Sequence, residues 1–205
     1  TVLLYLGAVS VVVAAFLALG QKDIKRMLAY SSISQVGYIV LGIGIGTPLG
    51  IAGGLFHLVN HALAKGLLFL TSGSIQQATG TRDLGEMGGL AKRMPFTAGT
   101  NLVGSLAIAG VPPLNGFASK WSLYVAGVRG GEFAPLLPIC ALFAILTSGL
   151  TLASFIKFFG AAFLARSATT TAGSSEPPIE EMPATMRYPQ VFLAAICLIL
   201  GLVPM

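Results

Sequence analysis

The stretch Ala109-Gly-Val-Pro-Pro-Leu-Asn-Gly-Phe-Ala-Ser-Lys120 interrupts an apolar segment that runs from about residue 97 to 128. Its helix-breaking residues are Gly110, Pro112, Pro113 and Gly116. Proline removes a backbone donor and stops a helix, and broken backbone at membrane depth occurs only where protein buries it or it lines a watery cavity. Because interrupted helices recur in ion-coupled transporters, we expect a discontinuous transmembrane helix here. The alternative is a plain proline kink from which Lys120 extends to the lipid headgroups.

The composition of the whole chain also indicates a membrane protein. Of the 205 residues, 55% are hydrophobic and 9% are charged, whereas soluble domains carry about a quarter charged residues. These figures exclude a disordered chain, which needs low hydrophobicity and high charge. Twelve Lys and Arg residues against seven acidic ones are too few for a nucleic-acid groove, so no nucleic-acid partner is expected.

Six membrane crossings are expected, because about 20 apolar residues cross a bilayer core of roughly 30 Å. They cover about residues 2–20, 25–46, 49–75, 97–128, 135–164 and 191–203. The predicted fold class is therefore an all-α polytopic membrane protein with about six transmembrane helices, one of them discontinuous. Because the chain begins inside the first of these segments, we also expect further sequence upstream.

The charges predict the orientation of the chain in the membrane. With six crossings, loops 21–26, 76–96 and 165–188 share one side. Their basic residues are Lys22, Lys25, Arg26, Arg82, Lys92, Arg93, Arg166 and Arg187, against Arg129 alone in the opposite loops. By the positive-inside rule these three loops face the cytoplasm, and the protein is expected in the cell's inner (plasma) membrane.

The ionisable residues inside the expected spans are all bases. They are His57, His61, Lys65, Lys120 and Lys157. The first three are spaced four residues apart, which places them on one helical stripe about 12 Å long. Charged residues at bilayer depth usually line a water path or proton relay, and imidazole exchanges protons near neutral pH. We therefore expect a proton path, although a hydrogen-bonded packing role is the alternative for either histidine alone.

Three lysines in or near the spans carry separate expectations. Lys25 is expected to reach inward from the start of its helix toward Ser31, Ser32 and Gln35. Lys120 is expected in the first turn after the break, where the positive end of a helix is unfavourable for a cation. For Lys157, a place in the proton path and simple extension to the membrane surface remain equal alternatives.

The two cysteines give no indication of a redox centre. Cys140 and Cys197 lie in apolar runs, and no CxxC pair occurs. This leaves no ligand set for zinc or an iron–sulfur cluster. We expect no metal, no cofactor and no catalytic residue in this chain.

Several of these residues belong to longer motifs that occur together in a known family. The segments Lys22-Asp-Ile-Lys-Arg-Met-Leu-Ala-Tyr-Ser-Ser-Ile-Ser-Gln35 and His57-Leu-Val-Asn-His-Ala-Leu-Ala-Lys-Gly-Leu-Leu-Phe-Leu70 resemble the antiporter-like subunits of respiratory complex I. The segments 80–95 and 110–120 agree with this resemblance, which covers about residues 1–165. Similar subunits occur in membrane-bound NiFe hydrogenases and in Mrp-type sodium/proton antiporters.

The resemblance implies a fold of fourteen core helices with two inverted five-helix repeats. This chain would supply the second repeat over residues 1–164, a cytoplasmic linker at 165–188 and a trailing transmembrane helix at 189–205. Similar subunits use the residues equivalent to five positions as stations of a hydrated proton path. These positions are Lys25, His57, His61, Lys65 and Lys120. Because the first repeat and its glutamate and lysine are missing, this segment alone is not expected to pump.

The main functional hypothesis is an antiporter-like subunit that translocates protons or sodium ions within a redox-driven electron-transport complex. That complex would resemble NADH-quinone oxidoreductase or a membrane-bound hydrogenase. Its partners would be other membrane subunits and redox subunits with Fe-S and NiFe or flavin centres. This chain would then be a non-redox membrane subunit of an oxidoreductase complex. The alternatives are a Mrp-type Na+/H+ antiporter subunit without a redox partner, and a passive scaffold whose bases pair with acids on adjacent chains.

Overall fold

The computed structural model describes residues 2–132, 134–166 and 179–203. This part of the chain is helical, apart from an isolated bridge between Asp23 and Asp83. Its helices are α1 (Val2–Gly20), α2 (Ile24–Ile45), α3 (Pro48–Thr79), α4 (Leu90–Arg93), α5 (Pro95–Ala109), α6 (Asn115–Arg129), α7 (Leu136–Phe159) and α8 (Ala184–Leu202). A 3-10 turn (Gly130–Glu132) follows α6, and a π-helical turn (Gly160–Leu164) continues α7. The predicted all-α fold class is confirmed.

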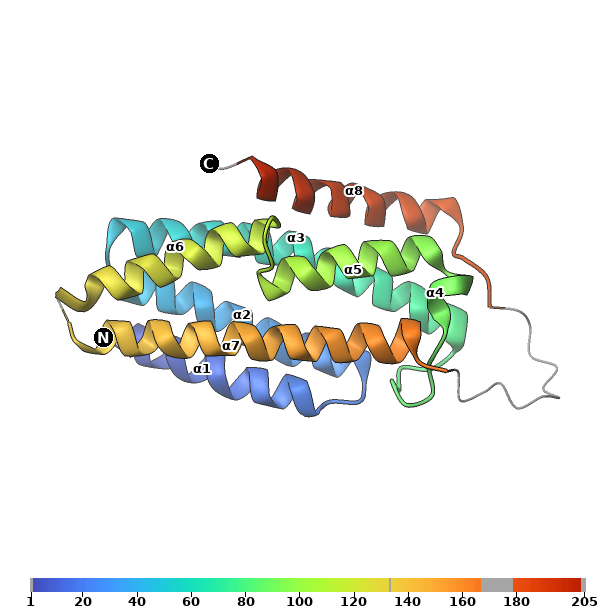
Figure 1. The fold of residues 1–205 in the computed structure, drawn as a ribbon, viewed down its shortest axis with the longest axis horizontal. Helices are drawn as coiled ribbons and strands as arrows, with labels where there is room; N and C mark the ends of the chain where they lie inside the picture. Colours follow the sequence, from blue (N-terminus) through green and yellow to red (C-terminus); the bar gives the residue numbers. More distant parts are fainter. Residues whose placement is uncertain (1, 133, 167–178, 204–205) are drawn as a thin grey trace.

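The long helices lie side by side along one axis (Figure 1). The short helices α5 and α6 follow one another end to end, so that together they match the length of α3. Helix α8 starts at the end opposite the start of α1 and runs back along the bundle to the level of the break, where Gly201 approaches Pro113 (Figure 1). The six expected spans therefore correspond to α1, α2, α3, the α5–α6 pair, α7 and α8.

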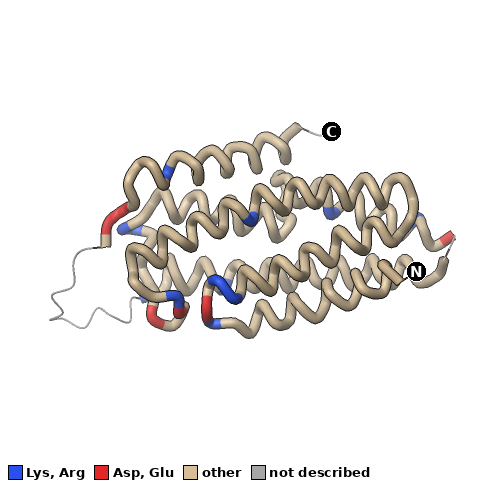
Figure 2. Tube along the Cα trace, turned by 180° about the vertical axis from the view of Figure 1, so that it is seen from behind, with Lys and Arg blue, Asp and Glu red and all other residues tan. Residues whose placement is uncertain are grey.

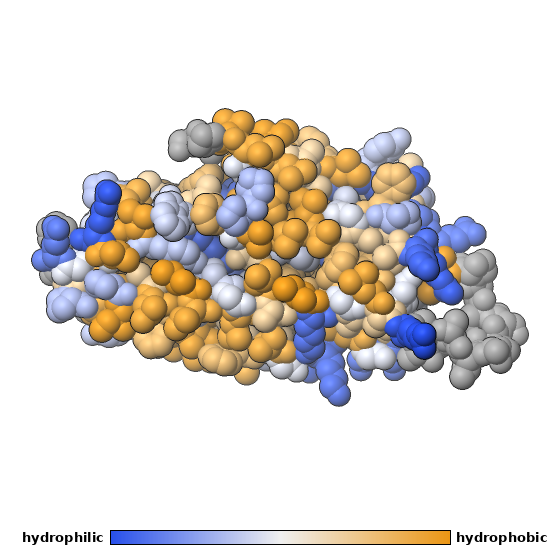
Figure 3. All heavy atoms as spheres, viewed as in Figure 1, coloured by the Kyte–Doolittle hydropathy of each residue, from blue (hydrophilic) through white to orange (hydrophobic). Residues whose placement is uncertain are grey.

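Helix length and surface chemistry both fit a bilayer. Among the described residues, four helical segments are long and apolar enough to span a membrane individually, namely Val2–Gly20, Ile24–Ile45, Leu136–Leu164 and Ala184–Leu202. On the face seen in Figure 3, hydrophobic side chains cover most of the middle and the hydrophilic ones gather at the ends. Large apolar residues such as Phe16 remain exposed, which is expected where lipid rather than water is the solvent.

Apart from the buried Lys65 and Lys120, the charged residues lie toward the two ends of the bundle (Figure 2). Most lie at the end formed by the α1–α2 and α3–α5 connections, while Arg129 and Glu132 lie at the opposite end. We call the end formed by the α1–α2 and α3–α5 connections the charged end. There the two connections are joined through the backbone, because the amide of Ile24 donates to the carbonyl of Arg82 and the amide of Leu84 donates to that of Lys22.

Two helix boundaries differ from the sequence-based expectation. Helix α8 begins at Ala184 instead of near residue 191, and Pro189 lies inside it. Helix α3 continues past residue 75 to Thr79, where Gly80 ends it in the left-handed conformation with φ of 73°. Both extensions lie outside the apolar core of the span, where hydropathy gives no signal. Much of the expected linker, residues 167–178, lies outside the described residues.

The break between α5 and α6 depends on glycine. Gly110 ends α5 with φ of 82°, which is a left-handed conformation that favours glycine. At Gly116 an added Cβ would overlap the carbonyl oxygen of Ala107. Helix α8 covers the break closely, because a Cβ at Gly201 would overlap the carbonyl oxygen of Pro113. Helix α8 therefore covers part of the break, while Pro112 and Pro113 remain exposed.

Candidate functional site

Helix α3 carries the three bases that the sequence places on one stripe. His57 and Lys65 are buried, with 1% and 5% of their surface exposed, and His61 between them is half-buried. We call His57, His61 and Lys65 the basic row. Its partners come from α2 and α6, which both pack against α3.

Lys65 binds to helix α2. Its ammonium donates to the backbone carbonyl of Leu28 at 2.9 Å and to Ser31 Oγ at 2.5 Å. It also lies 5.5 Å from the centre of the Phe155 ring, which belongs to α7. Ser31 was expected as a target for Lys25, but the structure gives its hydroxyl to Lys65.

His57 bridges α2 and α6. Its Nδ1 lies 2.9 Å from Ser119 Oγ, and its Nε2 lies 3.0 Å from Gln35 Oε1. The ring packs at 54° against Tyr38, with 5.6 Å between the ring centres. Both imidazole nitrogens therefore have polar partners inside the bundle.

Two buried nitrogens beside this bridge have no hydrogen-bond partner among the described residues. They are Nε2 of His61 and Nε2 of Gln35. Gln35 itself is completely buried. Because buried polar groups almost always have a partner, these two atoms are open to a hydrogen bond with water or another molecule from outside the chain.

Lys120 lies at the break, where it closes the gap between the two half-helices. Its ammonium donates to the carbonyls of Ile108 at 2.9 Å and Ala109 at 3.3 Å, at the C-terminal end of α5. That end carries the negative pole of the helix dipole. The expected unfavourable position beside the N-terminus of α6 is thus relieved, because the side chain reaches across the break to the opposite pole of α5.

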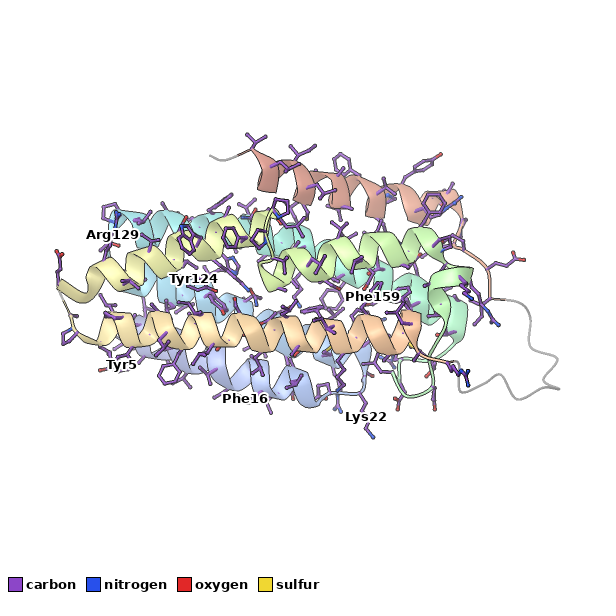
Figure 4. The ribbon with its side chains drawn as sticks, viewed as in Figure 1. Tyr5, Phe16, Lys22, Tyr124, Arg129 and Phe159 are labelled. Atoms are coloured by element: carbon purple, nitrogen blue, oxygen red, sulfur yellow. The ribbon has the colours of Figure 1, made fainter. Side chains whose placement is uncertain are left out.

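A cluster of hydroxyl groups completes the Lys120 site. Lys120 donates to Ser148 Oγ at 3.0 Å, and the same oxygen lies 2.7 Å from the hydroxyl of Tyr124 and 3.3 Å from that of Tyr38. Tyr124 extends from α6 toward α7 (Figure 4). The Tyr38 ring lies under the ammonium, 4.9 Å from its centre. These hydroxyl groups could not be assigned from sequence, because Ser148 and Tyr124 stand in apolar segments without a motif.

Two asparagines fix the start of α6 to α3. Asn60 Nδ2 donates to the carbonyl of Asn115 at 3.0 Å, and Asn115 Nδ2 donates to Asn60 Oδ1 at 3.1 Å. Both residues are buried. The position of Ser119 and Lys120 relative to the basic row is therefore determined by side-chain contacts as well as by helix packing.

Two of the expected path lysines lie at the charged end. Lys25 is half-buried in the first turn of α2. Lys157 is exposed and donates to the carbonyls of Leu19 and Gln21, both at 2.9 Å, at the C-terminal end of α1. The structure therefore brings His57, His61, Lys65 and Lys120 together, but places Lys157 elsewhere.

No carboxylate of the described residues lies in the middle of the bundle. Asp23 precedes α2, Asp83 and Glu86 lie between α3 and α4, and Glu132, Glu180 and Glu181 lie in connecting segments. The buried bases are instead held by carbonyl, hydroxyl and amide oxygens. Neutral acceptors of this kind form hydrogen bonds to a protonated lysine or histidine, but they do not cancel its charge as a carboxylate would.

Comparison with known proteins gives one family. Residues 1–151 match the family model described as NADH:quinone oxidoreductase/Mrp antiporter, TM. Hydrogenase-4 component B of Escherichia coli is 39% identical over 213 residues, which cover 96% of this chain and 31% of that protein. The chain thus spans about a third of the length of this curated relative.

Two solved structures have the same fold over nearly the whole chain. A chain of the archaeal membrane-bound sulfane sulfur reductase gives a TM-score of 0.89 at 36% identity, covering 99% of this chain and 32% of that one. A chain of the Mrp complex from Dietzia sp. gives 0.86 at 28% identity, covering 97% and 44%. Both similar structures are multi-subunit membrane complexes by their descriptions.

Proposed function

This chain belongs to the NADH:quinone oxidoreductase/Mrp antiporter transmembrane family, and from that premise we propose that it translocates protons as an antiporter-like subunit of a redox-driven membrane complex. It is a multi-pass membrane protein. Redox chemistry would take place in partner subunits with Fe-S and NiFe or flavin centres, and this chain would hold no cofactor. The similarity to a hydrogenase component and to a sulfane sulfur reductase complex supports this version of the function.

The observation that carries the proposal is the set of bases on α3 together with Lys120 at the break. Lys65 and His57 lie eight residues apart on α3, which corresponds to about 12 Å along the axis. His57 then contacts Ser119, whose neighbour in α6 is Lys120. Lysines and histidines at membrane depth are costly and mark ion or proton pathways, and here Lys65, His57 and Lys120 each have a hydrogen-bond acceptor in position.

A direction along this set follows from its place in the bundle. Lys25 lies at the charged end, Lys65 is the member of the basic row nearest that end, and Lys120 lies at the break beyond His57. If the charged end faces the cytoplasm, as the positive-inside rule requires, protons enter near Lys25 and leave beyond Lys120. Labelling of single cysteines placed at Arg82 and Arg129 from each side of intact cells tests this orientation.

The decisive experiment is Lys120→Ala in the full-length chain, assembled with its partners in inverted membrane vesicles. We expect proton transport to be lost while the partners still copurify, because the ammonium and its acceptors at the break are removed. Lys92→Ala is the matched control, because Lys92 is an exposed lysine of α4 at the charged end. Undiminished transport by the Lys120→Ala complex would contradict the proposal.

Two alternative functions give different results in the same assays. A Mrp-type Na+/H+ antiporter, favoured by the similarity to the Dietzia Mrp complex, would copurify without Fe-S or flavin subunits and would require sodium. A passive scaffold would lose its partners, rather than only its transport, in Lys65→Ala and Lys120→Ala. Copurification followed by identification of the partners separates the first two functions.

A further inference from the structure

The environment of His57 accommodates the imidazole both with and without an extra proton. Its Nε2 faces a carbonyl-type oxygen, Gln35 Oε1, at 3.0 Å, and its Nδ1 faces the hydroxyl of Ser119 at 2.9 Å. An amide oxygen can only accept a hydrogen bond, whereas a hydroxyl can donate or accept. The two sides of the ring are therefore chemically different.

Gln35 determines which nitrogen keeps its proton. Because Oε1 accepts, His57 Nε2 must carry a hydrogen in the arrangement that the structure has. Gln35 is completely buried, and its amide nitrogen has no acceptor among the described residues. The amide therefore acts as a fixed partner for Nε2–H and leaves its own N–H groups for a water molecule, the common partner of such buried donors.

Ser119 provides the exchangeable side. Its hydroxyl lies 2.9 Å from His57 Nδ1 and 3.2 Å from the carbonyl oxygen of Gly116. When His57 is neutral, the hydroxyl donates to Nδ1. When His57 is protonated, Nδ1–H donates to Ser119 Oγ, and the hydroxyl turns to the Gly116 carbonyl. Both states satisfy every group with one hydroxyl rotation and no movement of heavy atoms.

We propose that Gln35 and Ser119 are positioning residues that restrict proton exchange at His57 to Nδ1, through the Ser119 hydroxyl. A hydronium on the α6 side transfers one proton to Ser119 Oγ while the original hydroxyl proton moves to Nδ1, so that water, an intact hydroxyl and an imidazolium result. Release is the reverse. This inference rests on the proposed proton translocation. It adds Gln35 and Ser119 to the proton path, and it specifies that the proton reaches His57 from the α6 side.

The surrounding contacts keep this geometry in place. Asn115 Oδ1 accepts from the backbone nitrogen of Gly116 at 3.0 Å, and Asn115 is itself paired with Asn60 of α3. The acceptor for the rotated hydroxyl is thus fixed to the helix that carries His57. Ser119 precedes Lys120 in α6, so the exchangeable side of the ring faces the half-helix that carries the lysine of the break.

The test uses nitrogen NMR of the full-length chain in lipid bilayers with ¹⁵N-labelled histidine. Subtracting the spectrum of His57→Gln isolates the signals of His57 from those of other histidines. We expect neutral His57 as the Nε2–H tautomer, and a loss of this preference in Gln35→Leu. Gln35→Glu keeps an acceptor for Nε2–H and is expected to retain the tautomer. Gln190→Leu, which removes a buried glutamine bonded to Ser74, is the control and should leave the His57 signals unchanged.

Transport of the assembled complex gives the second readout. Ser119→Ala is expected to slow transport by about 100-fold, the lower end of what a positioned proton-transfer group contributes, and Ser119→Thr should restore it because it keeps the hydroxyl. A dominant Nδ1–H tautomer in the unmodified protein, or normal transport by Ser119→Ala, would overturn the inference. The tautomer is measured without transport, so it tests the inference even if Lys120→Ala disproves the proposed function.

Discussion

The ammonium of Lys120 lies 2.9 Å from the carbonyl oxygen of Ile108, across the break between α5 and α6. A lysine in the first turns of one half-helix is thereby bound to the last turn of the other. The charge of the side chain and the dipole of α5 favour each other, so the protonation of Lys120 is coupled to the relative position of the two half-helices. This coupling is a physical reason for a broken helix in an ion-translocating protein.

Removing the hydroxyl of Ser148 should impair transport without removing any ionisable group. Ser148 accepts from Lys120 and contacts the hydroxyl of Tyr124. A hydrogen bond to a charged group contributes about 1.5–3 kcal/mol, so we expect Ser148→Ala to slow transport by roughly 10- to 100-fold. Thr151→Ala is the control, because the Thr151 hydroxyl bonds only the Thr147 carbonyl of its own helix. Equal rates for the two variants would show that the Ser148 contact has no role.

Lys65 and Lys157 should respond differently to the same substitution. Lys65 is buried in the basic row, whereas Lys157 is exposed at the end of α1. We expect Lys65→Ala to abolish proton transport in vesicles. Lys157→Ala should stay within about twofold of the unmodified rate, as is usual for surface changes of roughly 0.5 kcal/mol or less. A loss of transport in Lys157→Ala with normal assembly would return Lys157 to the proton path.

The features that could be predicted from sequence are those that depend on local backbone chemistry. Gly110, Pro112 and Pro113 together strongly disfavour a continuous helix, so the break can be predicted without knowing what packs against it. The basic row is equally visible, because a spacing of four residues on α3 places His57 and Lys65 on one face. The six spans follow from apolar length alone.

The partners of these bases could not be predicted, because they come from other helices. Two acceptors of Lys120 are backbone carbonyls of α5. Every residue has a backbone carbonyl, so the sequence does not indicate which ones bind the lysine. Ser31 lies six residues, or about 1.7 helical turns, after Lys25, and the packing of α2 on α3 places its hydroxyl against Lys65 instead. The position of the Lys157 side chain could not be predicted, because a lysine near a helix end has the same sequence pattern whether it is buried or extends to the membrane surface.

The N-terminus of α5 should depend on an acid from the linker, Glu181. Glu181 Oε2 accepts from the backbone nitrogen of Phe96 at 2.8 Å, and its Oε1 accepts from the Thr97 hydroxyl at 2.6 Å. A lost helix cap costs about 1 kcal/mol, so Glu181→Ala should lower the thermal stability of the purified protein. Its exposed neighbour Glu180 serves as the control. A melting temperature for Glu181→Ala equal to that for Glu180→Ala would show that the cap adds no stability.

Adding a single methyl group at the break should be more damaging than adding one elsewhere in the bundle. A Cβ at Gly116 would overlap the carbonyl oxygen of Ala107, and neither backbone can move without separating α5 from α6. Overpacking costs about 1–3 kcal/mol even where side chains can adjust, so we expect Gly116→Ala to reduce the folded yield and to disrupt the Lys120 contacts. Gly149→Ala in α7 is the matched control, because no atom lies within 4 Å of its Cβ position. A stable, transport-competent Gly116→Ala protein would mean that the close approach at the break is not required for function.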